Sequence, residues 1–117
     1  MNRDQAIAKH DQPWKFEAGT FTTTPGVIEE LRQRFGNEDD GVGYLVACWL
    51  RHRQGDWGDV TSDDATVNDR AVEDGGRLIS AYPIDPEGER KGWGDNAIWL
   101  ITEADRSSTT AMLPSEY

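Results

Sequence analysis

Apolar positions along this chain follow helical spacing in the first two thirds and strand spacing in the last third. The first helical pattern covers residues 25–35, where four apolar side chains recur on one face: Val27, Ile28, Leu31 and Phe35. Thr24 and Pro25 are typical of a helix start, because Thr can cap free N–H groups and Pro is tolerated in the first turn. Gly36 is typical of a helix end. We therefore expect a helix that begins near residue 25 and ends before Gly36.

A second helical pattern runs from about Val42 to Arg53, after a polar loop over residues 37–41, and Gly55 is expected to stop it. Its apolar-leaning stripe comprises five side chains: Tyr44, Leu45, Cys48, Trp49 and His52. Cys48 is the only cysteine, so the chain cannot form an internal disulfide. Within this stripe we expect Cys48 to be a small core residue.

A third helix is predicted from Thr61 or Ser62, either of which can cap it, to about Asp74. Its inner face is thin and consists of four small side chains: Ala65, Asn68, Ala71 and Val72. An unpaired amide at this face would cost about 1–3 kcal/mol. We therefore expect Asn68 to be a structural residue that bonds backbone groups of the loop over residues 55–59 or of a sheet.

Segments of the last third have the composition and spacing of strands: residues 77–83, 96–103 and 109–114. A weaker alternation covers residues 15–22. Strands that follow one another through short turns predict an antiparallel meander. The expected fold class is therefore α+β, with about three helices packed on a three- to four-stranded antiparallel sheet.

The length of 117 residues suits one domain, which we place at residues 15–117 after an N-terminal arm of residues 1–14. The chain has 22 acidic and 12 basic residues, and its formal net charge at pH 7 is -10. This charge disfavours nonspecific binding to nucleic acid or to an anionic membrane, and it favours a basic protein partner. No apolar run approaches about 18 residues, and the N-terminus lacks the apolar stretch of a signal peptide, so we expect a cytoplasmic protein.

Negative charge is densest in residues 55–74, where one base, Arg70, stands among seven acids. These acids are the candidate partner-binding residues: Asp56, Asp59, Asp63, Asp64, Asp69, Glu73 and Asp74. Asp56 and Asp59 belong to the loop sequence GDWGD, where we expect them to be partly engaged. Free charge is expected on the outer face of the third helix, at Asp63, Asp69, Glu73 and Asp74.

Two interpretations of this acidic stretch stay open. Carboxylates spaced along a rigid helix can imitate duplex phosphates and so occupy a nucleic-acid-binding groove. The acids of residues 38–40 could extend such a surface into a band on one side of the molecule. In the other interpretation the third helix merely faces solvent.

A second function class is a small hydrolase or nucleotide-handling enzyme, in which His52 would act as general base beside Asp56, Glu103 and Arg106. A histidine at the end of an amphipathic helix is more often a packing residue or a partner of the helix dipole than a general base. A metal site at His52, Asp56 and Asp59 is disfavoured, because the spacing fits neither a calcium loop nor a zinc motif. We expect no metal and no cofactor. Whether the DWGD and EADR segments form a site or a salt-bridged scaffold stays open.

Over about residues 44–117 the chain resembles a family of small acidic proteins carried on bacterial plasmids, integrative elements and phages. The resemblance rests on four segments in the same order: LRHRQGDWGD, NDRA, GGRLISAY and IWLITEADRSSTTAMLPSEY. It implies a mobile element, whose small acidic proteins often counter host restriction or CRISPR defence by imitating DNA. No catalytic residue carries over, because the family has no established activity. We therefore expect a non-enzymatic protein that inhibits a host defence complex; the enzyme, and a plasmid module with an unrelated partner, are the alternatives.

Overall fold

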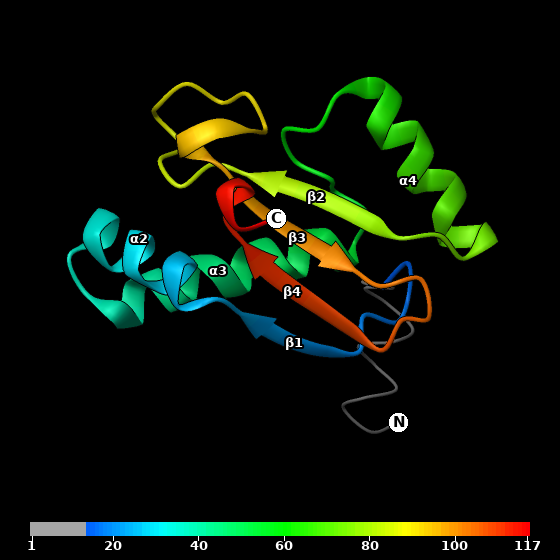
Figure 1. Cartoon of the computed structure of the whole chain (residues 1–117), viewed down its shortest axis with the longest axis horizontal. Coiled ribbons are helices and arrows are strands. Elements are labelled where there is room, and N and C mark those ends of the chain that lie inside the picture. The colour runs from blue at the N-terminus through cyan, green and yellow to red at the C-terminus, as the bar shows by residue number, and fades with distance from the viewer. Residues whose placement is uncertain (1–13) are drawn as a thin grey trace, which may run out of the picture.

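The computed structural model describes residues 14–117, so the predicted arm of residues 1–14 lies, except for Trp14, outside the described residues. Residues 14–117 contain three α-helices: α2 (Pro25–Phe35), α3 (Glu38–Arg53) and α4 (Ser62–Asp74). They also contain four strands: β1 (Thr20–Thr23), β2 (Leu78–Tyr82), β3 (Ile98–Thr102) and β4 (Ser108–Met112). The predicted α+β class, with three helices on a sheet of three to four strands, is confirmed (Figure 1).

The strands form one sheet in the order β1-β4-β3-β2. The pairs β2–β3 and β3–β4 are antiparallel, as the predicted meander requires. β1 instead pairs with β4 in parallel, so the sheet is mixed rather than purely antiparallel. The parallel pair joins Thr20 to Ser108, which lie near opposite ends of the chain. A local sequence pattern does not report a pairing between such distant segments, and this is why the expectation of a purely antiparallel sheet was incomplete.

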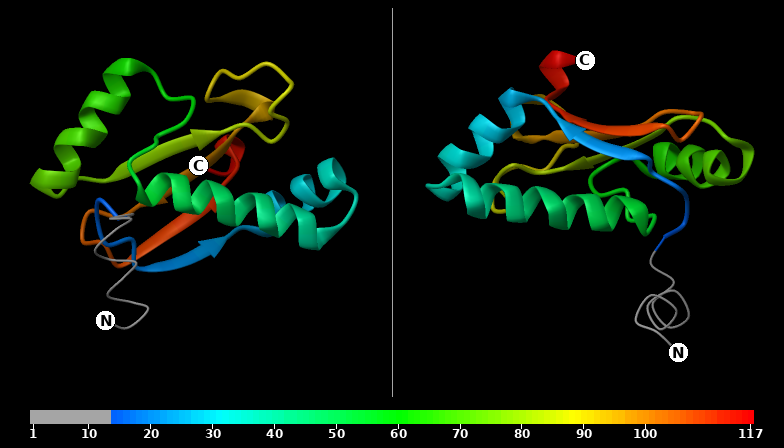
Figure 2. Two further views of the ribbon diagram at one scale, coloured as in Figure 1. Left: turned by 180° about the vertical axis from the view of Figure 1, so that it is seen from behind. Right: turned by 90° about the horizontal axis from the view of Figure 1, so that it is seen from below.

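Helices α2 and α3 cover one face of the sheet, and α4 lies beside the β2 edge (Figures 1 and 2). The main core fills the space between the sheet and the first two helices: Val27, Leu31, Leu45, Cys48, Tyr82, Ile84, Ile98, Leu100 and Ala111. Cys48 is buried as expected, and burial raises the pKa of its thiol to about 11. A second cluster connects α4 to the sheet: Phe16, Ala18, Trp57, Ala71 and Leu78.

Helices α2 and α4 begin and end where the sequence predicts. Thr24 and Thr61 cap their first turns with side-chain oxygens, and Gly36 and Gly75 end them in the left-handed conformation. α3 differs, because it begins at Glu38 rather than near Val42.

The early start of α3 follows from its cap. The side-chain oxygen of Asn37 accepts a hydrogen bond from the N–H of Asp40 at 2.8 Å. The predicted polar loop over residues 37–41 is therefore wrong. Its acids have the composition of a loop, but in the first turn of a helix they face the positive end of the helix dipole and stabilise it.

Groups from outside the sheet close the outer edge of β2. Asn68 donates a hydrogen bond to the carbonyl of Ile79 (2.9 Å) and accepts one from its N–H (3.2 Å). The N–H of Ala81 donates to the carbonyl of Trp57 (3.1 Å), and its carbonyl accepts from the N–H of Asp59 (2.7 Å). The expected structural role of Asn68 is thereby confirmed, and these groups of the edge strand are no longer available to pair with another strand.

The role of Asn68 gives a first testable prediction. We expect Asn68→Ala to lower the free energy of unfolding by about 2 kcal/mol, because both backbone groups of Ile79 lose their partner. Urea denaturation measures the loss. Thr66→Ala, at an exposed position of the same helix, is the matched control and should change stability by less than about 0.5 kcal/mol. Full stability in the Asn68 variant would contradict the structural role.

Candidate functional site

Four acidic side chains of α4 remain uncommitted within residues 14–117. Asp63 and Asp64 lie in the first turn of the helix, and Glu73 and Asp74 lie at its other end. All four are exposed, and none forms an ion pair with a side chain of residues 14–117. We call these four residues the acidic face of α4; Asp63, Glu73 and Asp74 share the outer side of the helix, and Asp64 lies on the flank that lines a neighbouring cleft.

The two acids at the C-terminal end of α4 oppose the helix dipole, at a cost of about 0.3–1 kcal/mol each. The last turn has no basic residue of its own. Arg106, from the turn between β3 and β4, instead donates hydrogen bonds to the carbonyls of Ala71 (2.7 Å) and Gly76 (2.6 Å). The helix end is thus satisfied from elsewhere, while Glu73 and Asp74 stay in solvent. Helix stability does not explain why these positions are acidic.

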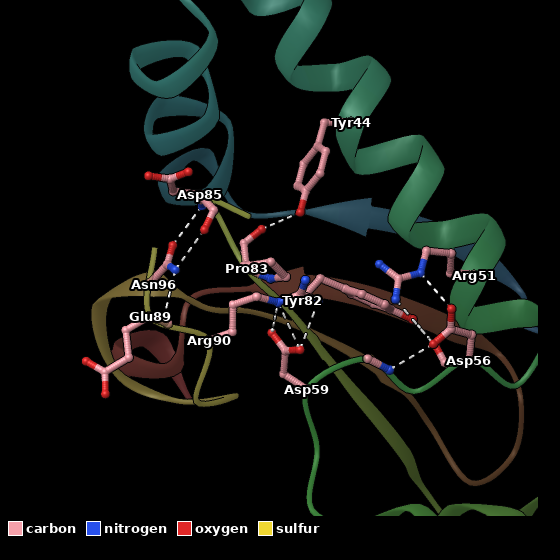
Figure 3. A network of polar contacts seen from close by, with 11 residues as sticks. Tyr44, Arg51, Asp56, Asp59, Tyr82, Pro83, Asp85, Glu89, Arg90 and Asn96 are labelled. Carbon is pink, nitrogen blue, oxygen red and sulfur yellow. Dashed lines mark hydrogen bonds and ion pairs between the residues drawn. The ribbon is translucent and has the colours of Figure 1, made fainter. Parts of the chain in front are cut away.

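Asp56 and Asp59 are engaged by arginines, as expected for the GDWGD loop (Figure 3). Arg51 Nε lies 2.7 Å from a carboxylate oxygen of Asp56, and this hydrogen bond lowers the pKa of Asp56. Arg90 Nη2 lies 3.0 Å from Asp59, whose side chain is only 13% exposed. Neither carboxylate belongs to the uncommitted set.

Asp69 is exposed and forms no ion pair within residues 14–117, so its charge stays uncompensated, but one of its oxygens is held in a hydrogen bond. Its Oδ1 atom accepts a hydrogen bond of 2.9 Å from the indole N–H of Trp57. Trp57 is buried, and a buried indole N–H requires an acceptor. Helical periodicity places Asp69 on the outer surface of α4 but does not reveal the indole that reaches it from the loop before the helix.

The acids at the start of α3 do not extend the acidic face of α4. Glu38, Asp39 and Asp40 lie where α3 follows α2, whereas α4 lies at the opposite end of the molecule (Figures 1 and 2). The single acidic band considered from the sequence is therefore wrong, and the two groups form separate surfaces.

A cleft of about 350 Å³ lies beside the acidic face of α4. Its lining combines the loop before α4, α4 itself, the edge strand β2 with Arg77 before it, β3, the loop over residues 91–93 and Tyr117. The lining residues are Asp59, Val60, Thr61, Asp64, Val67, Asn68, Arg77, Ile79, Ala81, Lys91, Gly92, Trp93, Trp99 and Tyr117. Val67, Trp93 and Tyr117 are large apolar side chains with about 60% of their surface exposed. Sequence reasoning missed this cleft; the available signal was the pair of tryptophans, Trp93 and Trp99, around the end of the charged loop.

The two basic residues of the cleft have partners within the chain. Arg77 donates to the hydroxyl of Tyr117 (2.9 Å) and lies 3.6 Å from Glu103. Lys91 Nζ lies 4.5 Å from the centre of the Trp93 ring and 3.8 Å from Glu89. The aromatic side chains that line the cleft therefore already contact cations, because the face of an aromatic ring attracts positive charge.

Asp64 is the charged group of the cleft without a side-chain partner in residues 14–117. Asp59, the other carboxylate of the lining, is held by Arg90. A ligand with an apolar stem and a positive end would match aromatic walls and a free carboxylate, and the side chains of arginine and lysine have this form. The cleft and the acidic face share Asp64, so the cleft adjoins the N-terminal end of the acidic face, whereas Glu73 and Asp74 lie at the other end of α4.

His52 is not available as a general base. It is completely buried, its Nδ1 atom lies 2.5 Å from the hydroxyl of Ser80, and its Nε2 atom lies 2.7 Å from the hydroxyl of Thr102. Burial lowers the pKa of His52 to about 3, with a smaller contribution from the positive charge of Arg106. The side chain is a neutral core group in contact with other protein atoms on every side.

The other members of the predicted catalytic group are engaged separately. Asp56 pairs with Arg51, Glu103 pairs with Arg77, and Arg106 holds the end of α4. The DWGD and EADR segments thus make separate scaffold contacts, and the four residues proposed for hydrolysis do not form one site.

Within residues 14–117 no group of three or more His, Cys, Asp or Glu residues is arranged to hold a metal ion. Of the helices in this part of the chain, none has the length and the apolar composition of a membrane span. Comparison of the chain with protein-family models, with curated proteins and with solved structures found no match.

Proposed function

We propose that this protein is a non-enzymatic inhibitor from a mobile genetic element, which occupies the basic nucleic-acid-binding surface of a host CRISPR or restriction complex. The observation that carries the proposal is the acidic face of α4, whose four carboxylates lack basic partners within residues 14–117. The family resemblance of residues 44–117 supports the mobile-element context. Such complexes act in the cytoplasm, where we expect this protein.

The spacing of the acidic face suits a surface that binds nucleic acid. Asp63 and Glu73 are ten positions apart on one helix, which corresponds to about 15 Å at about 1.5 Å per residue. This length spans roughly four base-pair steps of about 3.4 Å on duplex DNA. A basic groove that neutralises successive phosphates would therefore meet carboxylates at both ends of α4.

The cleft adds a second contact to the proposal. In the complex, an arginine or lysine of the partner inserts between Trp93 and Val67 and pairs with Asp64. Aromatic and charged groups of this kind dominate the binding energy of many interfaces. The contact also distinguishes the partner from nucleic acid, which would bring negative charge to Asp64.

A charge-reversal experiment tests the proposal. The wild-type protein, expressed in hosts with defined CRISPR or restriction systems, should raise phage plaquing or plasmid transformation. The triple variant Asp63→Lys, Glu73→Lys and Asp74→Lys should lower the affinity for the inhibited complex by roughly 100-fold or more, because each reversal places like charges together. Competition with labelled target DNA measures this affinity, which should also weaken as salt concentration rises.

The matched control reverses three exposed acids elsewhere, Glu30, Glu87 and Asp95, and so changes the net charge by the same amount. It should inhibit like the wild type. Equal inhibition by both triple variants would show that position is irrelevant and would refute the role of α4. If the wild-type protein raised neither phage plaquing nor plasmid transformation in any of the hosts tested, the proposed function itself would be refuted.

A further inference from the structure

The outer face of α3 carries an apolar stripe that no part of residues 14–117 covers. Val42, Val46 and Leu50 are 39%, 42% and 40% exposed, and their spacing of four places them on one side of the helix. The opposite side faces the core through Leu45 and Cys48. No charged residue occurs from Gly41 to Leu50. A helix that is apolar on both sides is typically buried on both sides.

Charge is confined to the two ends of α3. Glu38, Asp39 and Asp40 form the acidic first turn, and the last turn carries Arg51 and Arg53. A second α3 helix packed antiparallel to the first would bring each acidic end against a basic end. The two helix dipoles would then also be opposed, which is the favourable arrangement.

The outward residues of α3 are arranged symmetrically about Val46. Val42 and Leu50 lie four positions to either side of it, and Asp39 and Arg53 lie seven positions to either side. Helical periodicity places all five on the same side of the helix. An isologous interface requires this self-complementarity, because residue i of one copy contacts residue j of the other and j contacts i.

Two further features favour a helix as the occupant. Gly43 lies beside the stripe, and a Cβ atom built there would have nothing within 4 Å, so the backbone of another helix can approach closely. Arg53 forms no ion pair within residues 14–117, so it can pair with an acidic residue of the second copy. Its guanidinium stacks on Trp14 at 3.6 Å, which holds it at the end of the stripe.

We propose that the outer face of α3 is a homodimer interface, in which two copies pack their α3 helices antiparallel about a two-fold axis at Val46. In this register Val46 meets Val46 of the second copy, Val42 meets Leu50, and Asp39 meets Arg53. The stripe is small, so the dimer is weak and forms at micromolar or higher concentration.

Single cysteines test the register directly. Val46→Cys should form a disulfide-linked dimer under mild oxidation, because the two positions face each other across the axis. Val42→Cys should not crosslink with itself, but mixed with Leu50→Cys it should give the crosslinked heterodimer. Val67→Cys, at an exposed position on α4, is the matched control, and the native thiol of Cys48 is buried.

Two results would overturn the proposal. Self-crosslinking of Val42→Cys at the rate of Val46→Cys would indicate parallel packing or random collision. A full-length wild-type protein that sediments as a monomer at several hundred micromolar, without crosslinking of Val46→Cys, would show that the chain itself or another partner covers the stripe.

A substitution in the stripe gives an independent readout. Val46→Glu should raise the dimer dissociation constant at least tenfold in sedimentation equilibrium, whereas Val67→Glu should leave it unchanged. The inhibition assay separates this inference from the proposed function, because Val46→Glu keeps the acidic face of α4 intact. An unchanged dissociation constant in Val46→Glu would contradict the interface.

Discussion

Acidification from pH 6.5 to pH 3 should lower the free energy of unfolding by roughly 4 kcal/mol through a single side chain, His52. The folded-state pKa of His52 is lowered from 6.5 to about 3, chiefly by burial. The unfolded chain therefore takes up a proton near pH 6.5 that the folded protein does not accept until about pH 3. Between these values the unfolded state binds more protons, so stability falls as pH falls. Well above pH 6.5 the imidazole is neutral in both states and contributes no pH dependence.

The hydrogen bonds around His52 select one neutral tautomer. The chain of contacts ends at the carbonyl of Ala18, which can only accept, so the hydroxyl of Thr109 must donate to it (2.8 Å). Thr109 then accepts from Thr102 (2.6 Å), and Thr102 accepts from Nε2–H of His52 (2.7 Å). Nδ1 is left as an acceptor for the hydroxyl of Ser80. A second proton on the ring would reverse the contact with Ser80, and this adds to the cost of charging His52.

Nitrogen chemical shifts of the His52 ring should show the Nε2–H tautomer at pH 7 and no titration down to about pH 4. Denaturation between pH 5 and 7 measures the slope of stability, and His52→Gln, which cannot titrate there, should flatten it. Comparison with this variant separates His52 from the carboxylates, whose protonation also destabilises the protein at lower pH. Titration of His52 near pH 6.5 in the folded protein would contradict the prediction even if the Gln variant failed to fold.

Sequence reasoning predicted the elements of this fold whose signals are local. The caps at Thr24 and Thr61 and the glycines that end α2 and α4 act within a few residues, so they can be identified in the sequence. The start of α3 was missed because Asn37 is both a loop residue and a good cap, and only the chain conformation decides between these roles. The parallel pairing of β1 was missed because its partner strand is near the other end of the chain.

The candidate site was predicted only in part, because it too depends on contacts between segments that are distant in the sequence. The charge of α4 follows from composition and periodicity, but the availability of each carboxylate depends on donors from other elements. Asp69 accepts a hydrogen bond from the indole of Trp57, and Asp59 forms an ion pair with Arg90 from a distant loop. His52 and Arg106 suggested chemistry by residue type, yet both are committed to structure by contacts that sequence spacing does not encode.

Gly58→Ala should be among the most destabilising single substitutions in this protein. Gly58 has a φ of 74° and lies against β2, where a Cβ atom would be 2.0 Å from the carbonyl oxygen of Ala81. The same Cβ would be 2.9 Å from the ring of Tyr82, which is fully buried and cannot move aside. The backbone of the GDWGD loop must therefore retreat from the edge of the sheet.

The retreat breaks the contacts that close this edge. Ala81 loses its hydrogen bonds to Trp57 and Asp59, and the loop no longer holds Trp57 in its buried position. With left-handed backbone strain of about 1–2 kcal/mol and two lost hydrogen bonds of about 1 kcal/mol each, we expect a loss of about 3 kcal/mol or more. An opened edge strand also pairs with other chains, so we expect the variant to aggregate on partial unfolding.

Gly75→Ala separates the steric clash from the backbone strain. Gly75 has a φ of 90° at the end of α4, but a Cβ atom there would have nothing within 4 Å. This control should cost only the strain of about 1–2 kcal/mol and should not promote aggregation. Urea denaturation of both variants gives the difference, and light scattering at the transition midpoint reports aggregation. Equal losses in the two variants would mean that the contact between Gly58 and Ala81 does not hold the β2 edge closed, whereas a larger loss at Gly58 assigns the excess to that contact.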